Sequence, residues 1–282
     1  MKRINFCKYH GCGNDFIIVK EQDVKDLNIQ DLTRKVCDRT TGIGADGLLV
    51  DLNEVIGMDF FNQDGSHGTM CGNGLRSFCA YLVDQGKVSQ KIFNVQTPDS
   101  IKVVHHISSM PHIFNINLGV PSFDPKKIEI KTGKDIYLNE PFIYNNKTYY
   151  GHAVYTSVKH LVVFVDDESD LYDEGLGSFL SNNEVFIDRI NVDFVKVIDE
   201  HNFKMKTYER GVGFTKACGT GACASFVIGK LNNKCKDYVF VHMDLGILKI
   251  SQNESEIIME GPAQKICEGI YDYEENLWEY EI

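Results

Sequence analysis

Two cysteines of this chain stand in nearly identical surroundings that could support acid–base chemistry. Cys71 opens the sequence Cys-Gly-Asn-Gly, and Cys218 opens the sequence Cys-Gly-Thr-Gly. A glycine-rich polar loop precedes each cysteine, and apolar residues at helical spacing follow it. We therefore predict that each cysteine lies where a helix begins, beside free backbone N–H groups and the positive end of the helix dipole. Such a position can lower a cysteine pKa from about 8.5 to roughly 3.5 to 7.5.

Two helix N-termini that point at each other would form a site for a carboxylate. The backbone N–H groups that would converge on this anion belong to Gly72, Asn73, Gly219 and Thr220. One thiolate could then remove a proton from one face of the neighbouring carbon while the opposite thiol donates a proton to the other face. The predicted chemistry is the inversion of a stereocentre.

Simpler interpretations exist for most of the polar residues near these motifs. A buried cysteine is usually a small hydrophobic residue, and only the duplication sets Cys71 and Cys218 apart from the other cysteines. Taken alone, the remaining candidates would be a core histidine, a surface ion pair and two turn residues, namely His160, then Glu209 with Arg210, then Asn62 and Asn191.

The nine cysteines and nine histidines also allow a different class of protein, one that binds zinc or a partner. Structural zinc sites pair their ligands two to four residues apart, twice. Cys71 and Cys218 instead stand alone in glycine loops, so the spacing argues against a metal site. Metal analysis of the purified protein would decide between the two classes.

Length and composition indicate an ordinary globular protein that acts on a small molecule. A chain of 282 residues with 43% hydrophobic residues can bury a sizeable core in one large domain or two smaller ones. The formal charge of −11 argues against nucleic acid or an anionic membrane as the main partner. The N-terminus lacks the apolar region of a signal peptide, and no apolar run approaches the ~18 residues of a membrane span. We predict a cytoplasmic location.

The two cysteine motifs belong to a longer internal repeat. Cys71 and Cys218 are 218 − 71 = 147 positions apart. Other matches near this offset pair Asn62 with Glu209 and Asp46 with Asp193. A repeat of this length is too long for a solenoid and indicates two similar α/β domains.

Each predicted domain is a curved β-sheet wrapped around one central helix. The helices that follow the cysteines are apolar nearly all round, so they must be buried on every side. We place the N-terminal domain at residues 1–118, completed by residues 264–282, and the C-terminal domain at residues 119–263. Short segments rich in β-branched and aromatic residues predict strands at Lys91–Gln96, Ile101–His106, Ile113–Leu118, Tyr238–His242, Gly246–Ile250 and Ile270–Tyr273.

Several blocks along the whole chain resemble the diaminopimelate epimerase family, in the same order. These blocks are 9–16, 41–47, 62–66, 71–74, 209–211, 217–222 and 261–263. The resemblance implies two pseudo-symmetric α/β domains, an active site in the cleft between them, and catalysis without pyridoxal phosphate, metal or any other cofactor. It also implies a homodimer with a small-molecule amino-acid substrate.

The resemblance also assigns roles to single residues. It makes Cys71 and Cys218 the acid/base pair, with His160 supporting Cys71 and Glu209 supporting Cys218. The substrate carboxylate would be held by the backbone N–H groups of Gly72, Asn73, Gly219 and Thr220. Contacts with the rest of the substrate would come from Asn14, Asn62, Asn191, Glu209 and Arg210.

One block departs from the family pattern where the substrate would bind. The family usually has Gly-Asn-Pro-His, whereas this chain has Ser-Val-Lys-His at residues 157–160. Loss of the amide would cost about 1 to 3 kcal/mol, roughly five- to 150-fold in affinity. We predict that Val158 and Lys159 set the substrate preference. Diaminopimelate is the family default, and the alternative is a racemase of another amino acid such as histidine.

Overall fold

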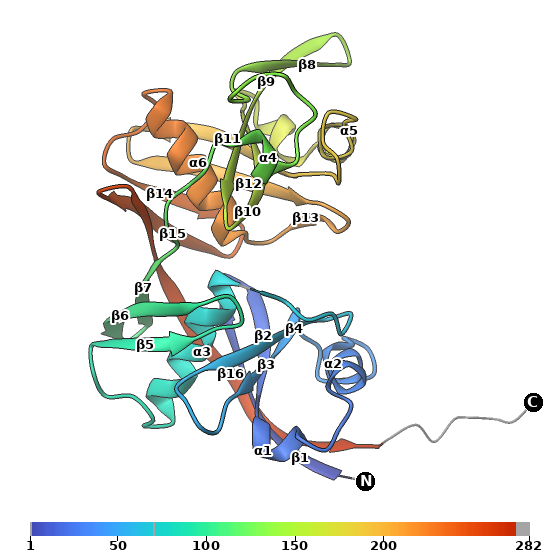
Figure 1. Cartoon of the computed structure of the whole chain (residues 1–282), viewed down its shortest axis with the longest axis vertical. Helices are drawn as coiled ribbons and strands as arrows, with labels where there is room; N and C mark the ends of the chain where they lie inside the picture. Colours follow the sequence, from blue (N-terminus) through green and yellow to red (C-terminus); the bar gives the residue numbers. More distant parts are fainter. Residues whose placement is uncertain (1, 70, 275–282) are drawn as a thin grey trace, which may run out of the picture. The chain divides into compact units, whose positions relative to one another are not determined.

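The computed structural model describes residues 2–69 and 71–274, and the chain divides into two compact units (Figure 1). The first unit consists of the chain up to Phe114 together with the C-terminal segment from Ala263. The second unit is Asn115–Pro262. In the part of the chain that the structure covers, no helix combines the length and the hydropathy needed to cross a membrane.

The first unit contains a sheet in which the neighbouring strands are β4, β3, β2, β1 and β16. A smaller group pairs β5 with β6 and β6 with β7, which extends past the end of this unit. The strands are β1 (Lys2–Gly11), β2 (Asn14–Lys20), β3 (Gly47–Asp51), β4 (Met58–Asn62), β5 (Ile92–Gln96), β6 (Ile101–Ser109), β7 (His112–Asn117) and β16 (Glu256–Tyr273). The helices are α1 (Glu21–Val24), α2 (Ile29–Cys37) and α3 (Gly72–Asp84).

In the second unit the neighbouring strands run in the order β16, β15, β14, β12, β11, β10, β9 and β8, with β13 beside β12. The strands are β8 (Glu140–Tyr144), β9 (Lys147–Thr156), β10 (Val158–Phe164), β11 (Asn191–Asp199), β12 (Asn202–Glu209), β13 (Gly213–Thr215), β14 (Tyr238–Met243) and β15 (Gly246–Asn253). The helices are α4 (Pro125–Ile128), the 3₁₀ helix η1 (Glu168–Tyr172), α5 (Glu174–Ser181) and α6 (Gly219–Leu231).

Helices α3 and α6 begin directly after the two cysteines, as the sequence predicted. Cys71 and Cys218 are the N-cap residues, with extended backbones, and each sulfur accepts a hydrogen bond from the N–H three residues later. Residues Gly72–Leu82 of α3 are all buried, and α6 packs against β9, β10, β11 and β15. The expectation of one enclosed helix in each repeat is therefore confirmed.

Further apolar side chains form one core cluster in each unit. In the first unit, Leu32 and Val36 of α2 pack against residues of β2 and β3 such as Leu48. In the second unit, Leu176 and Leu180 of α5 pack against residues of β10 and β11. The apolar positions of α2 lie four residues apart, which is the spacing that places side chains on one face of a helix.

Strand β16 is much longer than the sequence indicated. We predicted a last strand at Ile270–Tyr273, but the strand begins at Glu256 and has 18 residues. Its first part alternates between buried and partly exposed residues and pairs with β15, whereas most of its second part is exposed and pairs with β1. The exposed charged residues between 264 and 268 hide this strand from a pattern based on hydrophobicity. The other five predicted strands are confirmed as β5, β6, β7, β14 and β15.

The strand registers align the two halves differently from the sequence. Strand β3 begins at Gly47 and runs parallel to β2, the second strand of the β1–β2 hairpin. Strand β11 begins at Asn191 and runs parallel to β10, the second strand of the β9–β10 hairpin. These positions are 191 − 47 = 144 apart, whereas the cysteines are 147 apart. The predicted match of Asp46 with Asp193 is therefore wrong, because the β11–β12 hairpin is longer than the β3–β4 hairpin.

Candidate active site

In the second unit, the Cys218 thiol lies at one end of a short chain of polar contacts. Its Sγ is 3.4 Å from the hydroxyl oxygen of Thr220 and accepts a hydrogen bond of 3.4 Å from the Gly221 N–H. The same Thr220 hydroxyl is 3.0 Å from Nε2 of His160. His160 therefore contacts the Cys218 side of the molecule through Thr220.

The chain ends at a buried carboxylate that the sequence analysis did not select. Nδ1 of His160 is 2.8 Å from Oδ2 of Asp193, and both side chains are 0% exposed. The two atoms are within ion-pair distance, but they are not aligned as a hydrogen bond. Asp193 faces Val162 across the β10–β11 pairing, two residues beyond His160 and on the same face of the strand. The Thr207 hydroxyl donates to its other oxygen at 2.7 Å.

Asp193 also explains the second glycine of the Cys-Gly-Thr-Gly sequence. A Cβ atom at Gly221 would lie 2.2 Å from Oδ1 of Asp193, so only glycine fits there. The carboxylate thus lies against the first turn of α6. The positive end of a helix dipole stabilises an anion in this position.

The pKa of the Cys218 thiol is raised, which contradicts the predicted shift. Burial raises this pKa well above its usual value, and the negative charges of Glu209 and Asp193 raise it further. The hydrogen bonds from Thr220 and from the Gly221 N–H lower it, but by less. Burial beside two carboxylates therefore outweighs the two hydrogen bonds that the thiol receives. The same interaction shows that Glu209 lies near Cys218 within the second unit.

In the first unit, the Cys71 thiol faces a pair of amides. Its Sγ accepts a hydrogen bond of 3.4 Å from the Gly74 N–H and lies 3.8 Å from Oδ1 of Asn14. Asn73 donates to the same Oδ1 at 3.1 Å. The structure therefore brings Cys71, Asn14 and Asn73 together.

A buried guanidinium lies behind these amides. Arg76 is 0% exposed, and it donates to Oδ1 of Asn73 at 2.6 Å and to the Gly72 carbonyl at 3.4 Å. It also hydrogen-bonds the Cys12 thiol, whose pKa burial raises and Arg76 lowers. A Cβ at Gly11 would be 3.1 Å from the guanidinium, so the β1–β2 turn packs closely on it.

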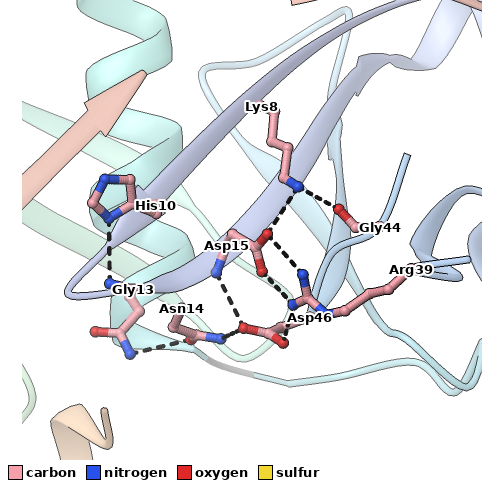
Figure 2. A network of polar contacts seen from close by, with 9 residues as sticks. Lys8, His10, Gly13, Asn14, Asp15, Arg39, Gly44 and Asp46 are labelled. Carbon is pink, nitrogen blue, oxygen red and sulfur yellow. Dashed lines mark hydrogen bonds and ion pairs between the residues drawn. The ribbon is translucent and has the colours of Figure 1, made fainter. Parts of the chain in front are cut away.

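On its other side, Asn14 joins a network of charged residues (Figure 2). Its Nδ2 donates to Asp46 at 2.6 Å, and Arg39 bridges Asp46 and Asp15 at 2.7 Å each. Lys8 completes the network, 2.9 Å from Asp15. Burial would raise the pKa of Asp15, but Arg39 and Lys8 outweigh it and lower the pKa.

The remaining predicted substrate contacts lie at the end of β4, at the start of β11 and directly after β12. Asn62 donates to the Ser66 hydroxyl at 3.0 Å in the loop after β4. Oδ1 of Asn191 accepts from the Arg210 N–H at 3.0 Å, while the Arg210 guanidinium pairs with Asp188 at 2.9 Å. A pocket of about 260 Å³ opens near this loop in the second unit and is lined by Glu174, Ser181, Asn182, Arg189, Tyr208, Gly211, Val212 and Gly213. None of the predicted catalytic side chains lines it.

Comparison with known proteins decides the family. The family described as diaminopimelate epimerase matches residues 6–120 and 152–266 of the chain. A diaminopimelate epimerase of Caldanaerobacter subterraneus is 37% identical over 279 residues, which cover 94% of this chain and 98% of that protein. One of Bacillus cytotoxicus is 36% identical over 284 residues, which cover 97% and 99% of the two chains.

The chain belongs to the diaminopimelate epimerase family. This membership confirms the resemblance drawn from the sequence blocks, and it makes the protein an isomerase.

Solved structures agree on the fold. A probable proline racemase of Agrobacterium radiobacter, crystallised with bound carbonate, has a TM-score of 0.69, with 98% of this chain and 94% of that chain covered. A PhzF-family phenazine biosynthesis protein of Bacillus anthracis has a TM-score of 0.66, with 97% and 100% covered. The sequence identities are 13% and 14%, so these likenesses concern the fold alone. The predicted fold class, two repeated α/β domains, is confirmed.

The departure from the diaminopimelate epimerase pattern has a structural counterpart at the start of β10. Ser157 stands where the family has glycine, and its backbone is left-handed with φ of 69°. Val158 begins the strand, and the ammonium of the buried Lys159 forms an ion pair with Glu129, the residue that ends α4. Lys159 is therefore engaged inside the protein.

Sequence reasoning missed three groups in this diaminopimelate epimerase fold. Asp193 was noticed only as a repeat match, Thr220 only for its backbone N–H, and Arg76 not at all. A charged residue five positions after Cys71, within an otherwise apolar helix, was the available signal for Arg76. For the zinc alternative, residues 2–69 and 71–274 contain no group of three His, Cys, Asp or Glu side chains arranged to hold a metal ion.

Proposed function

We propose that the protein inverts the α-carbon of an amino acid, with Cys71 and Cys218 as the acid/base pair. The observation that carries this proposal is the repeated position of the two thiols. Each caps a buried helix, and each sulfur accepts the N–H of the third residue of that helix. An inversion requires two proton handlers, because one must act on each face of the carbon.

The helix starts would also hold the substrate. The first N–H groups of a helix have no carbonyl partner within it, so they can bind an anion. The groups that would hold the α-carboxylate belong to Gly72, Asn73, Gly219 and Thr220. The side chains that would contact the rest of the substrate are Asn14, Asn62, Asn191, Glu209 and Arg210. Glu209 would support Cys218, which agrees with its proximity to that thiol.

This chemistry needs neither pyridoxal phosphate nor a metal ion, because the thiols move the protons and the N–H groups stabilise the charge that develops on the carboxylate. Turnover should therefore persist in the presence of EDTA and of hydroxylamine, which traps pyridoxal phosphate. Strong inhibition by either reagent would contradict the proposal.

The substrate that we propose first is diaminopimelate. The curated relatives at 36% and 37% identity carry the name diaminopimelate epimerase and match this chain over nearly its whole length. The test is a panel of L-amino acids with LL-diaminopimelate in D2O, with exchange of the α-proton followed by NMR. Exchange confined to diaminopimelate would support this assignment.

A second candidate is the racemisation of histidine or another single amino acid. It is favoured by Val158, which replaces an amide that the family uses for the substrate, and by Lys159, whose ammonium is paired with Glu129. Neither side chain then offers the lost hydrogen bond to a distal group. Faster exchange with L-histidine than with LL-diaminopimelate in the same panel would select this candidate.

We further propose a homodimer, which rests on the family resemblance. Size-exclusion chromatography with light scattering should give about twice the chain mass of 32.0 kDa. A mass equal to one chain would remove this part of the proposal.

A further inference from the structure

We propose that the Thr220 hydroxyl carries the Cys218 proton to His160, and that Asp193 holds His160 in the tautomer that can accept it. This inference rests on the proposed two-thiol function and adds a proton path to one of the two thiols. The path lies wholly within the second unit. Its separations are 3.4 Å from sulfur to hydroxyl, 3.0 Å from hydroxyl to imidazole and 2.8 Å from imidazole to carboxylate.

The far end of the path fixes the direction of every contact. A carboxylate only accepts, so neutral His160 carries its proton on Nδ1, beside Asp193, and presents Nε2 as an acceptor. The Thr220 hydroxyl therefore donates to Nε2. Its oxygen is then free to accept the thiol proton of Cys218.

The surroundings of the buried Asp193 carboxylate point to no role other than orienting His160. Asp193 and His160 are 0% exposed, and among the described residues the carboxylate accepts a hydrogen bond from the Thr207 hydroxyl and lies within ion-pair distance of the imidazole. A buried carboxylate is costly unless it is compensated. The first turn of α6 and a developing imidazolium both compensate it, and glycine at position 221 leaves the room it needs.

The proton transfer is balanced. The S–H bond of Cys218 breaks as its proton moves to the Thr220 oxygen, and the original Thr220 O–H bond breaks as that proton moves to Nε2. The products are a thiolate and an imidazolium, with the hydroxyl restored. No oxidant or other reactant is needed. The thiolate can then take the α-proton of the substrate.

The path also provides the base that Cys218 needs in its buried and negatively charged surroundings. Burial, Glu209 and Asp193 keep this thiol protonated, so a base must remove its proton before Cys218 can itself act as a base. His160 is the group that the contacts place at the end of the path. The family resemblance instead pairs His160 with Cys71, so the two assignments make opposite predictions for the two thiols.

The experiment compares Thr220→Val with Thr220→Ser. Valine keeps the shape and the backbone N–H of threonine but removes the hydroxyl, whereas serine retains it. Alkylation of each cysteine by iodoacetamide, followed by peptide mass spectrometry, reports the thiolate fraction without any substrate. Thr156→Val is the matched control, because its buried hydroxyl donates to the Thr220 carbonyl at 2.9 Å and lies outside the path.

We expect Thr220→Val to slow the alkylation of Cys218 and not that of Cys71. With the substrate found in the panel, kcat should fall by about 10²-fold or more while KM stays close to that of the parent protein. Thr220→Ser should recover most of both losses. Asp193→Asn, a positioning variant, should slow Cys218 alkylation in the same way, because an amide that donates to Nδ1 leaves Nε2 protonated.

Three results would overturn the proposal. Cys218 could react in Thr220→Val as fast as in the parent protein, Thr156→Val could produce the same loss as Thr220→Val, or Cys71 could be the thiol that slows. Cys218→Ala separates this proposal from the proposed function. If that variant still inverts substrate, the two-thiol function fails. If it is inactive while Thr220→Val is fully active, only the proton path fails.

Discussion

The two cysteines occupy the same backbone position in the repeat, but their surroundings carry opposite charges. Behind Cys71 lies the buried guanidinium of Arg76, whereas behind Cys218 lies the buried carboxylate of Asp193. The position in α6 that corresponds to Arg76, 147 residues later, is the buried Cys223. The duplication has thus kept the helix start and changed the groups that act on the thiol.

This difference teaches that the two thiols are not interchangeable. Cys71 faces amides whose orientation is fixed from both ends, by Arg76 as a donor and by Asp46 as an acceptor. Cys218 faces a hydroxyl that in turn contacts an imidazole, and both groups can move protons. A symmetric backbone therefore carries one fixed environment and one that can shift protons.

The largest expected effect comes from removing either thiol. Cys71→Ala and Cys218→Ala should each lower turnover by about 10² to 10⁴-fold, because each removes the proton handler for one face. Cys79→Ala and Cys223→Ala are the controls, and as truncations within packed helices they should affect stability and leave the chemistry intact. Turnover by α-proton exchange provides the measurement. Near-normal turnover in either thiol variant would show that the two halves do not share the reaction.

The next largest difference should come from glycine substitutions at the two helix starts, which should change the free energy of unfolding by unequal amounts. Gly221→Ala should lower the free energy of unfolding by about 3 kcal/mol, because the added methyl would lie 2.2 Å from Asp193. Gly74→Ala should be neutral or raise stability by up to about 1 kcal/mol, because its nearest neighbours would be 3.4 Å away and alanine favours helices. Urea unfolding measures both, and equal effects would show that the halves are packed alike.

Arg76→Met tests the pair of amides, Asn73 and Asn14, that faces Cys71. It should lower the free energy of unfolding by about 1 to 3 kcal/mol, because Oδ1 of Asn73 loses a buried donor. Arg76→Lys keeps the charge but has fewer donors in a fixed arrangement. Its free energy of unfolding should therefore fall between those of the parent protein and Arg76→Met. Unchanged urea midpoints in both variants would mean that Arg76 does not hold the Asn73 and Asn14 amides.

The smallest expected effect comes from restoring an amide that only the first half retains. Val158→Asn with Lys159→Pro should favour diaminopimelate by about 0.5 to 1.5 kcal/mol, roughly two- to tenfold in relative kcat/KM. The ratio of rates for LL-diaminopimelate and L-histidine is the measurement. An unchanged ratio would leave these two positions without a role in substrate preference.

Local sequence patterns were sufficient for the backbone around each thiol. A polar glycine loop followed by apolar residues at helical spacing predicts a buried helix that begins at Cys71 or Cys218, because the turn and the first helical residues are neighbours in sequence. The strands of the β5–β6 and β14–β15 hairpins were predictable for the same reason. Period and turn chemistry are local properties.

The polar partners were not predictable, because they depend on strand register and enclosure. His160 reaches Asp193 only because β10 and β11 pair in one particular register, across 33 residues of sequence. Arg76 looks like an exposed residue in an apolar helix until the β1–β2 turn closes over it at Gly11. Likewise, only the fold brings Lys159 to Glu129.

The long strand β16 determines the order in which the chain can be completed during synthesis. Strand β1 gains its first neighbour as soon as β2 has been made, but its other edge pairs with residues 264–273, near the end of the chain. An unpaired strand edge is a template for wrong partners. The first unit therefore keeps an open edge until the second unit has been translated.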